Sequence, residues 1–466
     1  MLIRTKDLKS KYDYIIVGSG ITGMTILREL IERDKTNILI IESGSVQSKL
    51  PYPDFMKVKS NNIKIKSRFS GVGGASNVWG TISGIFDEEQ INSFYKKKKF
   101  PFNYDNYKKY ITAASKYGFP KLNDFFSDFT INEKLKVKKF IKVTPNIRYF
   151  HFSSMLESDK VHFLQNTIVD SISQSKVFFK SEFQKIIITA STNKIILCAN
   201  TIENIKILSK SNLNINSKVL GKGFMNHPKG VIGSIKRKRE FDDFISIQCQ
   251  NEVSYQGIQL KNSKYKHYLK ISPGYKIPFL DRIIKQLDGN LKFHKKEFVG
   301  TNYRILNYFY LFIFKLLKFF NKIINKLFNN YLYLEAFTEM KMVNTNEVNY
   351  FKENNITEVN YELSSDELGS LNNLIIEFEK TFKTNIIYKP SNLNKLKKIV
   401  SNDASHHMGG IICGENKNNS IVDLNLRLHN SKSIYVCGGG VFPFSGVANP
   451  TLSYIALAIW LAEEIS

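Results

Sequence analysis

Cysteine is scarce in this sequence. The 466 residues contain four cysteines, Cys198, Cys249, Cys413 and Cys437, and the closest two are 437 − 413 = 24 positions apart. This spacing excludes a CxxC redox pair and a zinc ribbon, and four thiols are too few for a disulfide framework. The cysteine content therefore indicates a reducing compartment.

Long apolar runs are also missing. The most membrane-like segment is 305–334, and its longest uncharged stretch, 305–314, is far short of the ~20 residues that a spanning helix needs. Residues 1–12 are polar and charged, so we expect no secretory leader there. Together these features predict a cytoplasmic protein.

Acidic residues are few relative to basic ones. The chain has 67 Lys+Arg against 41 Asp+Glu, a net charge of +26, while 42% hydrophobic residues exclude a disordered chain. Such a charge is compatible with nucleic acid, an anionic membrane or an acidic substrate as partner. However, Lys far outnumbers Arg, which is the usual residue for planar phosphate recognition. With no nucleic-acid-binding motif present, we expect no nucleic-acid partner.

Segment 305–334 carries part of this charge in a regular pattern. Four lysines recur at helical spacing, and an apolar set is expected to lie opposite them: Lys315, Lys318, Lys322 and Lys326 against Leu316, Phe320, Ile323, Ile324 and Leu327. The pattern predicts an amphipathic basic helix with two open interpretations. It either packs on its own domain with the lysines in water, or lies in an anionic membrane surface at the inner face of the membrane.

A glycine-rich turn follows the first apolar run. Residues 12–17 are typical of a buried parallel strand, and Gly18-Ser-Gly20-Ile-Thr-Gly23 then leads into a helix over 24–32. In a GxGxxG motif the glycines allow a tight turn, close approach to a pyrophosphate, and helix–strand packing. A second strand, 37–41, ends at Glu42, where a carboxylate can bind ribose hydroxyls and disfavours NADP by its charge. This unit predicts NAD or FAD binding.

Two further segments are typical of a flavin site. Residues 71–80 hold four glycines and a Trp, so backbone N–H groups can approach a flat ligand. Near the C-terminus, a strand over 433–437 precedes three glycines. Asn449 and Pro450 then read as the N-cap and first residue of a helix over 451–462.

A series of segments resembles the glucose–methanol–choline (GMC) oxidoreductases in the same order along the chain. They are 18–23 with Glu42, 73–79, 102–110, 196–203, 221–228, 405–414 and 435–458. Two departures stand out. Asn200 replaces a usual glycine, and 410–413 lacks an arginine that the family carries.

The resemblance implies an α/β fold, with a Rossmann-like FAD-binding domain on a parallel sheet and a substrate domain on an antiparallel sheet with covering helices. The FAD domain would comprise 1–90, 160–230 and 400–466, and the substrate domain 91–159 and 231–399. Alternating runs at 333–350 and 356–363 predict strands of the antiparallel sheet, and 368–382 predicts a helix covering it.

The resemblance also implies FAD as the cofactor. The expected contacts are Gly18, Gly20, Ile21, Thr22, Gly23, Glu42, Ser43, Gly73, Gly74, Ser76, Asn77, Val78, Val169, Ala199, Gly439, Asn449, Pro450 and Thr451. Some family members attach FAD through a histidine at the position of Val78, so we expect non-covalent FAD here. We expect no metal, because the tandem histidines have no third ligand at suitable spacing.

By the same resemblance, His406 is the catalytic base and Asn449 donates a hydrogen bond to the substrate oxygen, with the roles of His406 and His407 open to exchange. His227, next to Pro228, is interpreted as structural. The predicted reaction oxidises a CH–OH group of a small alcohol or sugar-like substrate by hydride transfer to flavin N5, with an unknown electron acceptor. The alternatives are a different flavoprotein oxidoreductase and a catalytically silent FAD-binding scaffold at a membrane surface.

Overall fold

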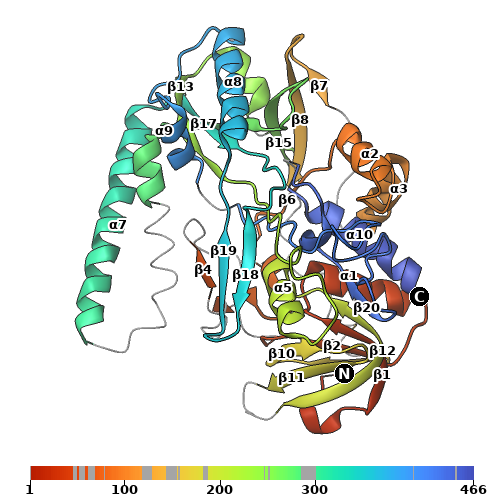
Figure 1. The fold of residues 1–466 in the computed structure, drawn as a ribbon. Helices are drawn as coiled ribbons and strands as arrows, with labels where there is room; N and C mark the ends of the chain where they lie inside the picture. Colours follow the sequence, from red (N-terminus) through yellow and green to blue (C-terminus); the bar gives the residue numbers. More distant parts are fainter. Residues whose placement is uncertain are drawn as a thin grey trace.

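A computed structural model of the chain describes most of its residues. They are 2–45, 50–51, 58–60, 69–77, 79–117, 128–142, 155, 158–181, 187–245, 247–249, 252–284, 301–401, 404–446 and 449–466. Two large sheets organise these residues, one at each end of the molecule in the view of Figure 1.

The first sheet has seven strands and a parallel centre. Five strands run parallel, in the order β9 (Val161–Leu164), β2 (Ile38–Ile41), β1 (Lys11–Val17), β12 (Ile188–Leu197) and β20 (Ile434–Val436). The first half of β12 instead pairs with an antiparallel extension, β11 (Lys176–Ser181) followed by β10 (Thr167–Ile172). The central strands β1 and β2 are nearly all buried, as their apolar runs predict.

Three helices follow strands of this sheet. They are α1 (Ile21–Glu32) after β1, α5 (Thr201–Lys210) after β12, and α10 (Thr451–Ile465) beyond β20. Helices α1 and α10 pack against each other, and α3 (Tyr104–Ala113) packs against α10. The first and last described helices therefore form one layer on this sheet.

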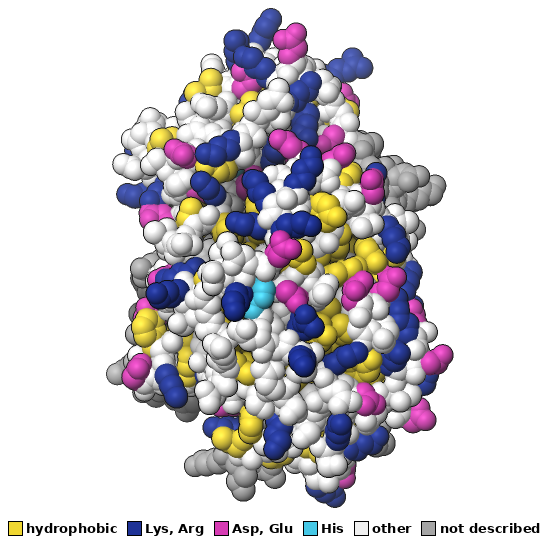
Figure 2. Space-filling model, turned by 45° about the vertical axis from the view of Figure 1, so that its right-hand side comes forward, with side chains coloured by type: hydrophobic (Ala, Val, Ile, Leu, Met, Phe, Trp, Pro, Cys, Tyr) yellow, Lys and Arg dark blue, Asp and Glu magenta, His cyan; other side chains and the backbone are white. Residues whose placement is uncertain are grey.

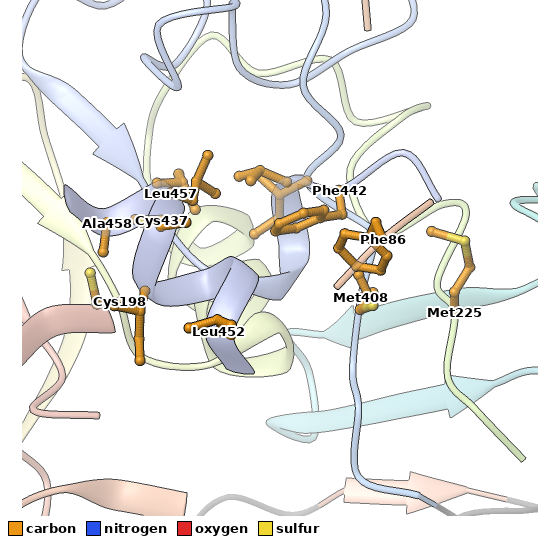
Figure 3. Packing of buried hydrophobic residues seen from close by; sticks show 14 of the residues in the cluster. Phe86, Cys198, Met225, Met408, Cys437, Phe442, Leu452, Leu457 and Ala458 are labelled. Carbon is orange, nitrogen blue, oxygen red and sulfur yellow. The ribbon is translucent and has the colours of Figure 1, made fainter. Parts of the chain in front are cut away.

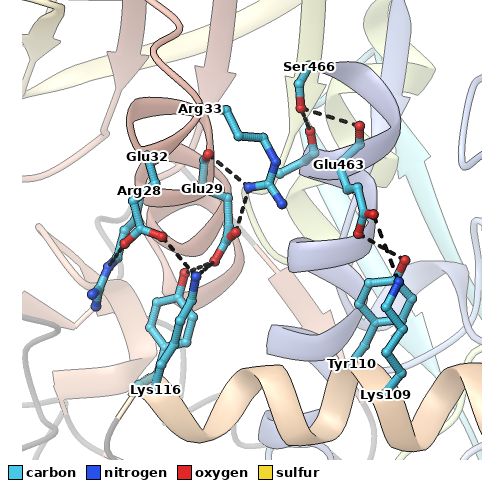
Figure 4. A network of polar contacts seen from close by, with 11 residues as sticks. Arg28, Glu29, Glu32, Arg33, Lys109, Tyr110, Lys116, Glu463 and Ser466 are labelled. Atoms are coloured by element: carbon cyan, nitrogen blue, oxygen red, sulfur yellow. Dashed lines mark hydrogen bonds and ion pairs between the residues drawn. The ribbon is translucent and has the colours of Figure 1, made fainter.

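Charged side chains join these helices at their ends (Figure 4). The buried carboxylate of Glu29 accepts hydrogen bonds from Arg33, at 2.6 Å, and from the Tyr117 hydroxyl, at 2.7 Å, and it pairs with Lys116. These donors hold the pKa of Glu29 below its usual value although burial opposes them. On α10, Glu463 accepts from the Tyr110 hydroxyl of α3 at 3.0 Å.

The second sheet has eight strands and is antiparallel. Its main order is β13 (Lys229–Lys236), β17 (Tyr331–Phe337), β16 (Tyr268–Pro273), β15 (Glu252–Leu260), β8 (Leu135–Lys142) and β6 (Ile82–Ser83), with β14 (Ile247–Cys249) on β15 and β7 (Phe129–Thr130) on β8. Helix α8 (Ser365–Thr381) lies near β16, as predicted for a covering helix (Figure 1). It begins with a capping box between Ser364 and Glu367.

The predicted strand over 333–350 is wrong as a single element. Strand β17 ends at Phe337, and β18 (Glu347–Phe351) belongs to a separate three-stranded sheet with β19 (Ile356–Asn360) and β4 (Val58–Ser60). Between them, Thr338 donates to the Pro228 carbonyl and Met340 exchanges hydrogen bonds with Ser445. These contacts lead the chain from one sheet to another, which an alternating pattern cannot reveal.

The remaining elements are short. They are β3 (Leu50–Pro51) paired with β5 (Phe69–Ser70), α2 (Glu88–Lys96), α9 (Leu393–Ile399), and the 3-10 turns Thr5–Asp7, Gly74–Asn77, Ala114–Tyr117, Arg239–Phe244 and Gly439–Val441.

Three cysteines, Cys198, Cys413 and Cys437, are buried core residues. Cys198 and Cys437 lie just beyond β12 and β20, and they pack close to α10 residues such as Leu452 and Ala458 (Figure 3). Burial raises the pKa of the Cys198 thiol to about 12. Because the reactive form of cysteine is the thiolate, these buried thiols are expected to be unreactive.

One long helix lies apart from both sheets. Helix α7 (Thr301–Leu327) is part of the connection between β16 and β17, along one side of the molecule (Figure 1). It confirms the helix predicted over 305–334 as far as Leu327, but residues 331–334 of that prediction belong to β17. None of the described helices is both long enough and apolar enough to cross a membrane.

Candidate active site

A cavity of about 890 Å³ lies at the carboxyl ends of the central parallel strands. Its wall includes Gly18 after β1, Glu42 after β2, Ala199 near the end of β12 and Gly438 near the end of β20. Ligands of open α/β sheets bind at this edge, where the connections on the two sides diverge. The fold therefore brings four separate predicted segments to one cavity.

The turn between β1 and α1 has the geometry that each of its glycines permits. Gly18 has a φ of +96°, and a Cβ on Gly23 would lie 2.1 Å from the Gly18 carbonyl oxygen. A Cβ on Gly20, in contrast, would meet no atom closer than 4.0 Å. Gly18 and Gly23 thus shape the turn, whereas Gly20 keeps space open beside the cavity.

Glu42 is more heavily engaged than the sequence suggested. Its buried carboxylate accepts from Ser19 N and Oγ, Ser43 Oγ, Gly44 N and Gly71 N, at 2.7–3.1 Å. A carboxylate offers about four lone-pair positions, so a ribose hydroxyl must displace one of these donors. Ser43 is the donor that lies in the cavity wall and is only half-buried. Glu42 therefore ties three loops together as well as placing negative charge beside the cavity.

The second glycine loop packs directly on the first. Gly73 N donates to the Ser19 carbonyl at 3.0 Å, and a Cβ on Gly74 would lie 3.3 Å from Gly20 Cα. Ser76 Oγ donates back to the Gly73 carbonyl at 2.5 Å, which stabilises the turn. Trp79 Nε1 lies buried near the cavity with no hydrogen-bond partner among the described residues. It is a donor that sequence reasoning did not single out.

Asn200 keeps the backbone conformation of the glycine that it replaces. Its φ is +74° and its ψ is 154°, a combination that is essentially restricted to glycine, so the backbone is strained at this residue. Its side chain also accepts from Ile202 N at 3.2 Å and so caps α5. The cap of α5 therefore offsets part of the backbone strain that the loss of glycine causes at this turn.

The predicted capping role of Asn449 is wrong. Helix α10 begins at Thr451 with Pro450 at its N-cap, and no side chain caps it. Asn449 Oδ1 and Tyr454 Oη are both buried, and neither has a hydrogen-bond partner among the described residues. Both residues line the cavity. Tyr454 lies one turn along from Pro450, a spacing that could have identified it from the sequence.

Two histidines from distant segments meet beside this cavity. Nδ1 of His227 lies 2.9 Å from Nδ1 of His406, and Nε2 of His227 lies 2.9 Å from the Ser445 carbonyl oxygen. Backbone hydrogen bonds between Met225 and Met408 hold the two segments together. Asn226 Oδ1 adds bonds from both His227 N and His406 N.

These contacts determine which ring nitrogens carry protons. The Ser445 carbonyl can only accept, so Nε2 of His227 carries a hydrogen. Burial lowers the pKa of His227 to about 4, so the ring is neutral near pH 7 and its Nδ1 is an acceptor. His406 must then donate from Nδ1, which leaves its Nε2 unprotonated in the neutral ring. The half-buried His406 lies in the cavity wall.

His407 has a different environment. It is buried, and its ring centroid lies 5.6 Å from that of Phe224. Its backbone carbonyl accepts from Thr201 Oγ1 at 2.8 Å and lies 2.2 Å from where a Gly439 Cβ would be. His407 also lines the cavity, but its main-chain contacts join α5 to the turn after β20.

Most of the predicted cofactor contacts come together. Those in the cavity wall are Gly18, Gly20, Ile21, Thr22, Glu42, Ser43, Gly74, Ser76, Val169, Ala199, Gly439, Asn449, Pro450 and Thr451, with His406. Gly23, Gly73 and Asn77 lie outside this wall, and Asn77 Nδ2 donates to the Val72 carbonyl at 2.6 Å. Val78 lies outside the described residues.

The cavity fits a dinucleotide. Its wall includes both the glycine turn after β1 and the start of α10, and its volume is that of a large ligand site. Gly20 leaves room for a pyrophosphate. Trp79, Asn449 and Tyr454 each have a buried polar atom without a hydrogen-bond partner among the described residues, and a bound ligand could supply one. Among the described residues there is no cluster of three or more metal-ligating side chains.

Comparison with solved structures shows the same fold. Pyridoxine 4-oxidase from Mesorbium loti matches with a TM-score of 0.61 and 11% identity over 97% of this chain and 99% of that one. A fungal aryl-alcohol oxidase matches with a TM-score of 0.63 and 12% identity, over 98% and 99%. At the sequence level, residues 345–458 match the GMC oxidoreductase family model. The resemblance to the GMC oxidoreductases is thereby confirmed. No curated protein matches the chain in sequence.

The matched GMC segment contains most of the C-terminal site. It includes His406, His407, Gly439 and Asn449, and it ends within α10. The predicted fold class, a Rossmann-like parallel sheet joined to an antiparallel sheet with covering helices, is also confirmed. His227 and the N-terminal glycine turn lie outside the matched segment and reach the site through the fold.

The basic residues do not form one continuous patch on the face shown in Figure 2. There, Lys and Arg side chains are spread over the surface and interspersed with Asp and Glu. Such mixing is typical of a solvated surface.

Proposed function

We propose that this protein is an FAD-dependent oxidoreductase that oxidises a CH–OH group, with His406 as the base and Asn449 as the hydrogen-bonding partner of the substrate oxygen. The observation that carries the proposal is the hydrogen-bonded chain from the Ser445 carbonyl through His227 to His406. It favours the protonation state in which His406 can accept a proton at Nε2.

The division of labour between the residues follows from their chemistry. FAD, when bound, supplies the hydride acceptor that alcohol oxidation requires. His406 Nε2 takes the hydroxyl proton, and its Nδ1–H stays hydrogen-bonded to neutral His227, which steadies the ring as it becomes positively charged. Asn449, whose Oδ1 has no described partner, orients the substrate oxygen through its side-chain amide.

The cofactor is held without a covalent bond in this proposal. Glu42 would bind the ribose, Gly18 and Gly20 would face the pyrophosphate, and the start of α10 would face the flavin; these residues all line the cavity. The positive end of the α10 dipole favours negative charge on the nearby ring. GMC oxidoreductases generally bind FAD, which supports FAD over NAD.

The test is flavin reduction under anaerobic conditions. The purified protein should be yellow, and an alcohol should bleach it. The first alcohols to screen are pyridoxine and aryl alcohols, after the two similar structures. His406→Ala should retain FAD but lose bleaching by at least ~100-fold, as expected for removal of a general base. His429→Ala, which lies outside the cavity wall, is the control.

The outcomes separate the alternatives. Bleaching by any alcohol excludes a catalytically silent scaffold. Wild-type flavin reduction in His406→Ala contradicts the base assignment, and loss of reduction in His407→Gln with FAD retained would transfer the role to His407. Bleaching only by a donor without a hydroxyl group, such as an amine, would indicate a different flavoprotein oxidoreductase.

A further inference from the structure

The exposed side of α7 is unusually apolar. Phe312, Phe319 and Leu327 have 63%, 60% and 71% of their surface exposed, and Leu316, Phe320 and Ile323 are also exposed. These six residues recur at steps of three and four, so they share one face of the helix. We call them the apolar stripe. Such a run of large exposed side chains on one element marks an interaction surface.

The opposite side of α7 already has a partner within the chain. Phe314 is buried and Asn325 Oδ1 accepts from Tyr275 N at 2.7 Å. Just beyond the end of the helix, the Phe328 ring stacks on Tyr275 with centroids 4.6 Å apart. Ile324, which the sequence placed with the other apolar residues, is half-buried. The expected single apolar face is therefore divided, one part packed and one part in solvent.

The lysines form a third face next to the apolar stripe. Lys315, Lys318, Lys322 and Lys326 are all exposed and recur at the same three- and four-residue steps. The helix contains no Asp or Glu. An apolar face bordered by a wholly basic one is the arrangement of helices that lie in the surface of an anionic bilayer.

We propose that α7 docks this protein on an anionic lipid membrane, with the apolar stripe in the headgroup region and the four lysines on lipid phosphates. Charge decides against a second copy of the chain as the occupant. Two α7 helices meeting along their stripes would bring eight lysines together with no acid on either helix. The charge complementarity instead fits an anionic surface.

The position of α7 in the fold suits this role. Strands β16 and β17 pair from Tyr268↔Phe337 to Pro273↔Leu332, so the sheet is complete before the connection begins. The helix is therefore an addition to the hairpin rather than part of the sheet. Exposed substitutions on it should change docking without changing the cavity.

The experiment is co-sedimentation of the FAD-loaded full chain with vesicles of phosphatidylcholine alone and of phosphatidylcholine mixed with phosphatidylserine. We expect binding only to the mixed vesicles. It should weaken as salt rises, because the screening length falls from about 10 Å at 0.1 M to about 3 Å at 1 M. Flavin absorbance before sedimentation confirms that each variant is folded.

Two variants remove the two parts of the surface, and each has a matched control. Phe312→Ser with Phe319→Ser should weaken partitioning by more than tenfold, while Ile376→Ser, an exposed apolar residue of α8, should not. Lys322→Glu with Lys326→Glu should weaken it by more than about 25-fold, since each lysine near such a surface contributes about fivefold. Lys96→Glu with Lys97→Glu at the end of α2 is the charge control.

Unchanged partitioning of either α7 variant would overturn the proposal. So would absence of vesicle binding combined with a dimer that Phe312→Ser and Phe319→Ser convert to a monomer, because the occupant would then be a second copy. Equal loss in the control variants would also overturn it, since binding would then follow total charge or total exposed apolar surface rather than α7. None of these readouts depends on alcohol oxidation, so the result is independent of the proposed chemistry.

Discussion

Nδ1 of His227 lies 2.9 Å from Nδ1 of His406, although 179 positions separate them in the sequence. The sequence led us to interpret His227 as structural. In the fold it is the only described hydrogen-bond link between the His406 ring and the Ser445 carbonyl. The two imidazoles therefore behave as one unit in which the buried ring sets the tautomer of the half-buried one.

The first prediction concerns His227 as a positioning residue. His227→Leu should lower the rate of flavin reduction by about 100-fold with little change in substrate affinity, because His406 can then adopt the other tautomer. His227→Gln should recover part of the rate, since its amide can donate to the Ser445 carbonyl and accept from His406. Stopped-flow reduction of the FAD-loaded variants measures both.

A purely structural His227 would give a different pattern. Both variants would then lose FAD and thermal stability together, with no difference in the pH dependence of reduction. A rate of flavin reduction that recovers in His227→Gln but not in His227→Leu would indicate that His227 acts through its hydrogen bonds.

A second prediction is acid sensitivity of the fold. Burial lowers the pKa of His227 to about 4 and of His267 to about 3, against about 6.5 in an unfolded chain. Between those values the unfolded state binds more protons than the folded state, so the free energy of unfolding should fall as pH falls below 6.5. His227 alone contributes about 3 kcal/mol across its window. Urea titrations at pH 4.5 and 6.5 measure the difference.

Glu339 provides the opposing control. Burial raises its pKa to about 7, so it favours the folded state at low pH and loses that contribution as pH rises from about 4.5 to 7. His227→Gln should therefore reduce the stability difference between the two pH values, and Glu339→Gln should enlarge it. A reversed order would contradict the pKa directions.

Substitution of the two glycines Gly23 and Gly20 in the first turn should affect different properties, stability in one case and FAD affinity in the other. Gly23→Ala places a Cβ 2.1 Å from the Gly18 carbonyl oxygen, so α1 must move and the protein should lose several degrees of melting temperature. Gly20→Ala meets no atom closer than 4.0 Å, so stability should be unchanged while FAD affinity drops at least tenfold. Apo-protein melting and fluorimetric FAD titration separate the effects. Equal melting temperatures for the two variants would count against this assignment.

The attachment of FAD gives a fourth prediction. Acid precipitation of the yellow protein should leave all flavin absorbance in the supernatant, as expected for a cofactor without a covalent link. The control is the same protein precipitated after proteolysis, which would release any flavin peptide with altered chromatographic mobility. Flavin remaining in the pellet would contradict non-covalent binding.

Local patterns were enough to predict the nucleotide-binding half of the fold. The unit from β1 through the Gly18 turn to α1 depends on neighbours in sequence, and the structure shows it with boundaries shifted by a few residues. Likewise, Glu42 was predicted at the end of β2. What the sequence could not show is that its carboxylate also accepts from Gly71 N, a contact made across two loops.

The features that sequence reasoning missed depend on tertiary contacts. Helical spacing groups the residues of α7 into faces but does not say which face meets Tyr275. The end of β17 at Phe337 is set by contacts with Pro228 and Ser445, which are distant in sequence. Asn449 lies one residue before the N-cap position of α10, which Pro450 occupies.

The pairing of β12 with β20 has a consequence for how the protein is made. Along one edge, the second half of β12 pairs only with β20, from Ile195↔Ile434 to Leu197↔Val436. Strand β20 comes after nearly all other described strands and helices in the sequence. A growing chain therefore presents an apolar sheet edge until these residues emerge from the ribosome. The same late segment and α10 contribute Gly438, Gly439 and Thr451 to the cavity wall, so the site is complete only after synthesis has passed them.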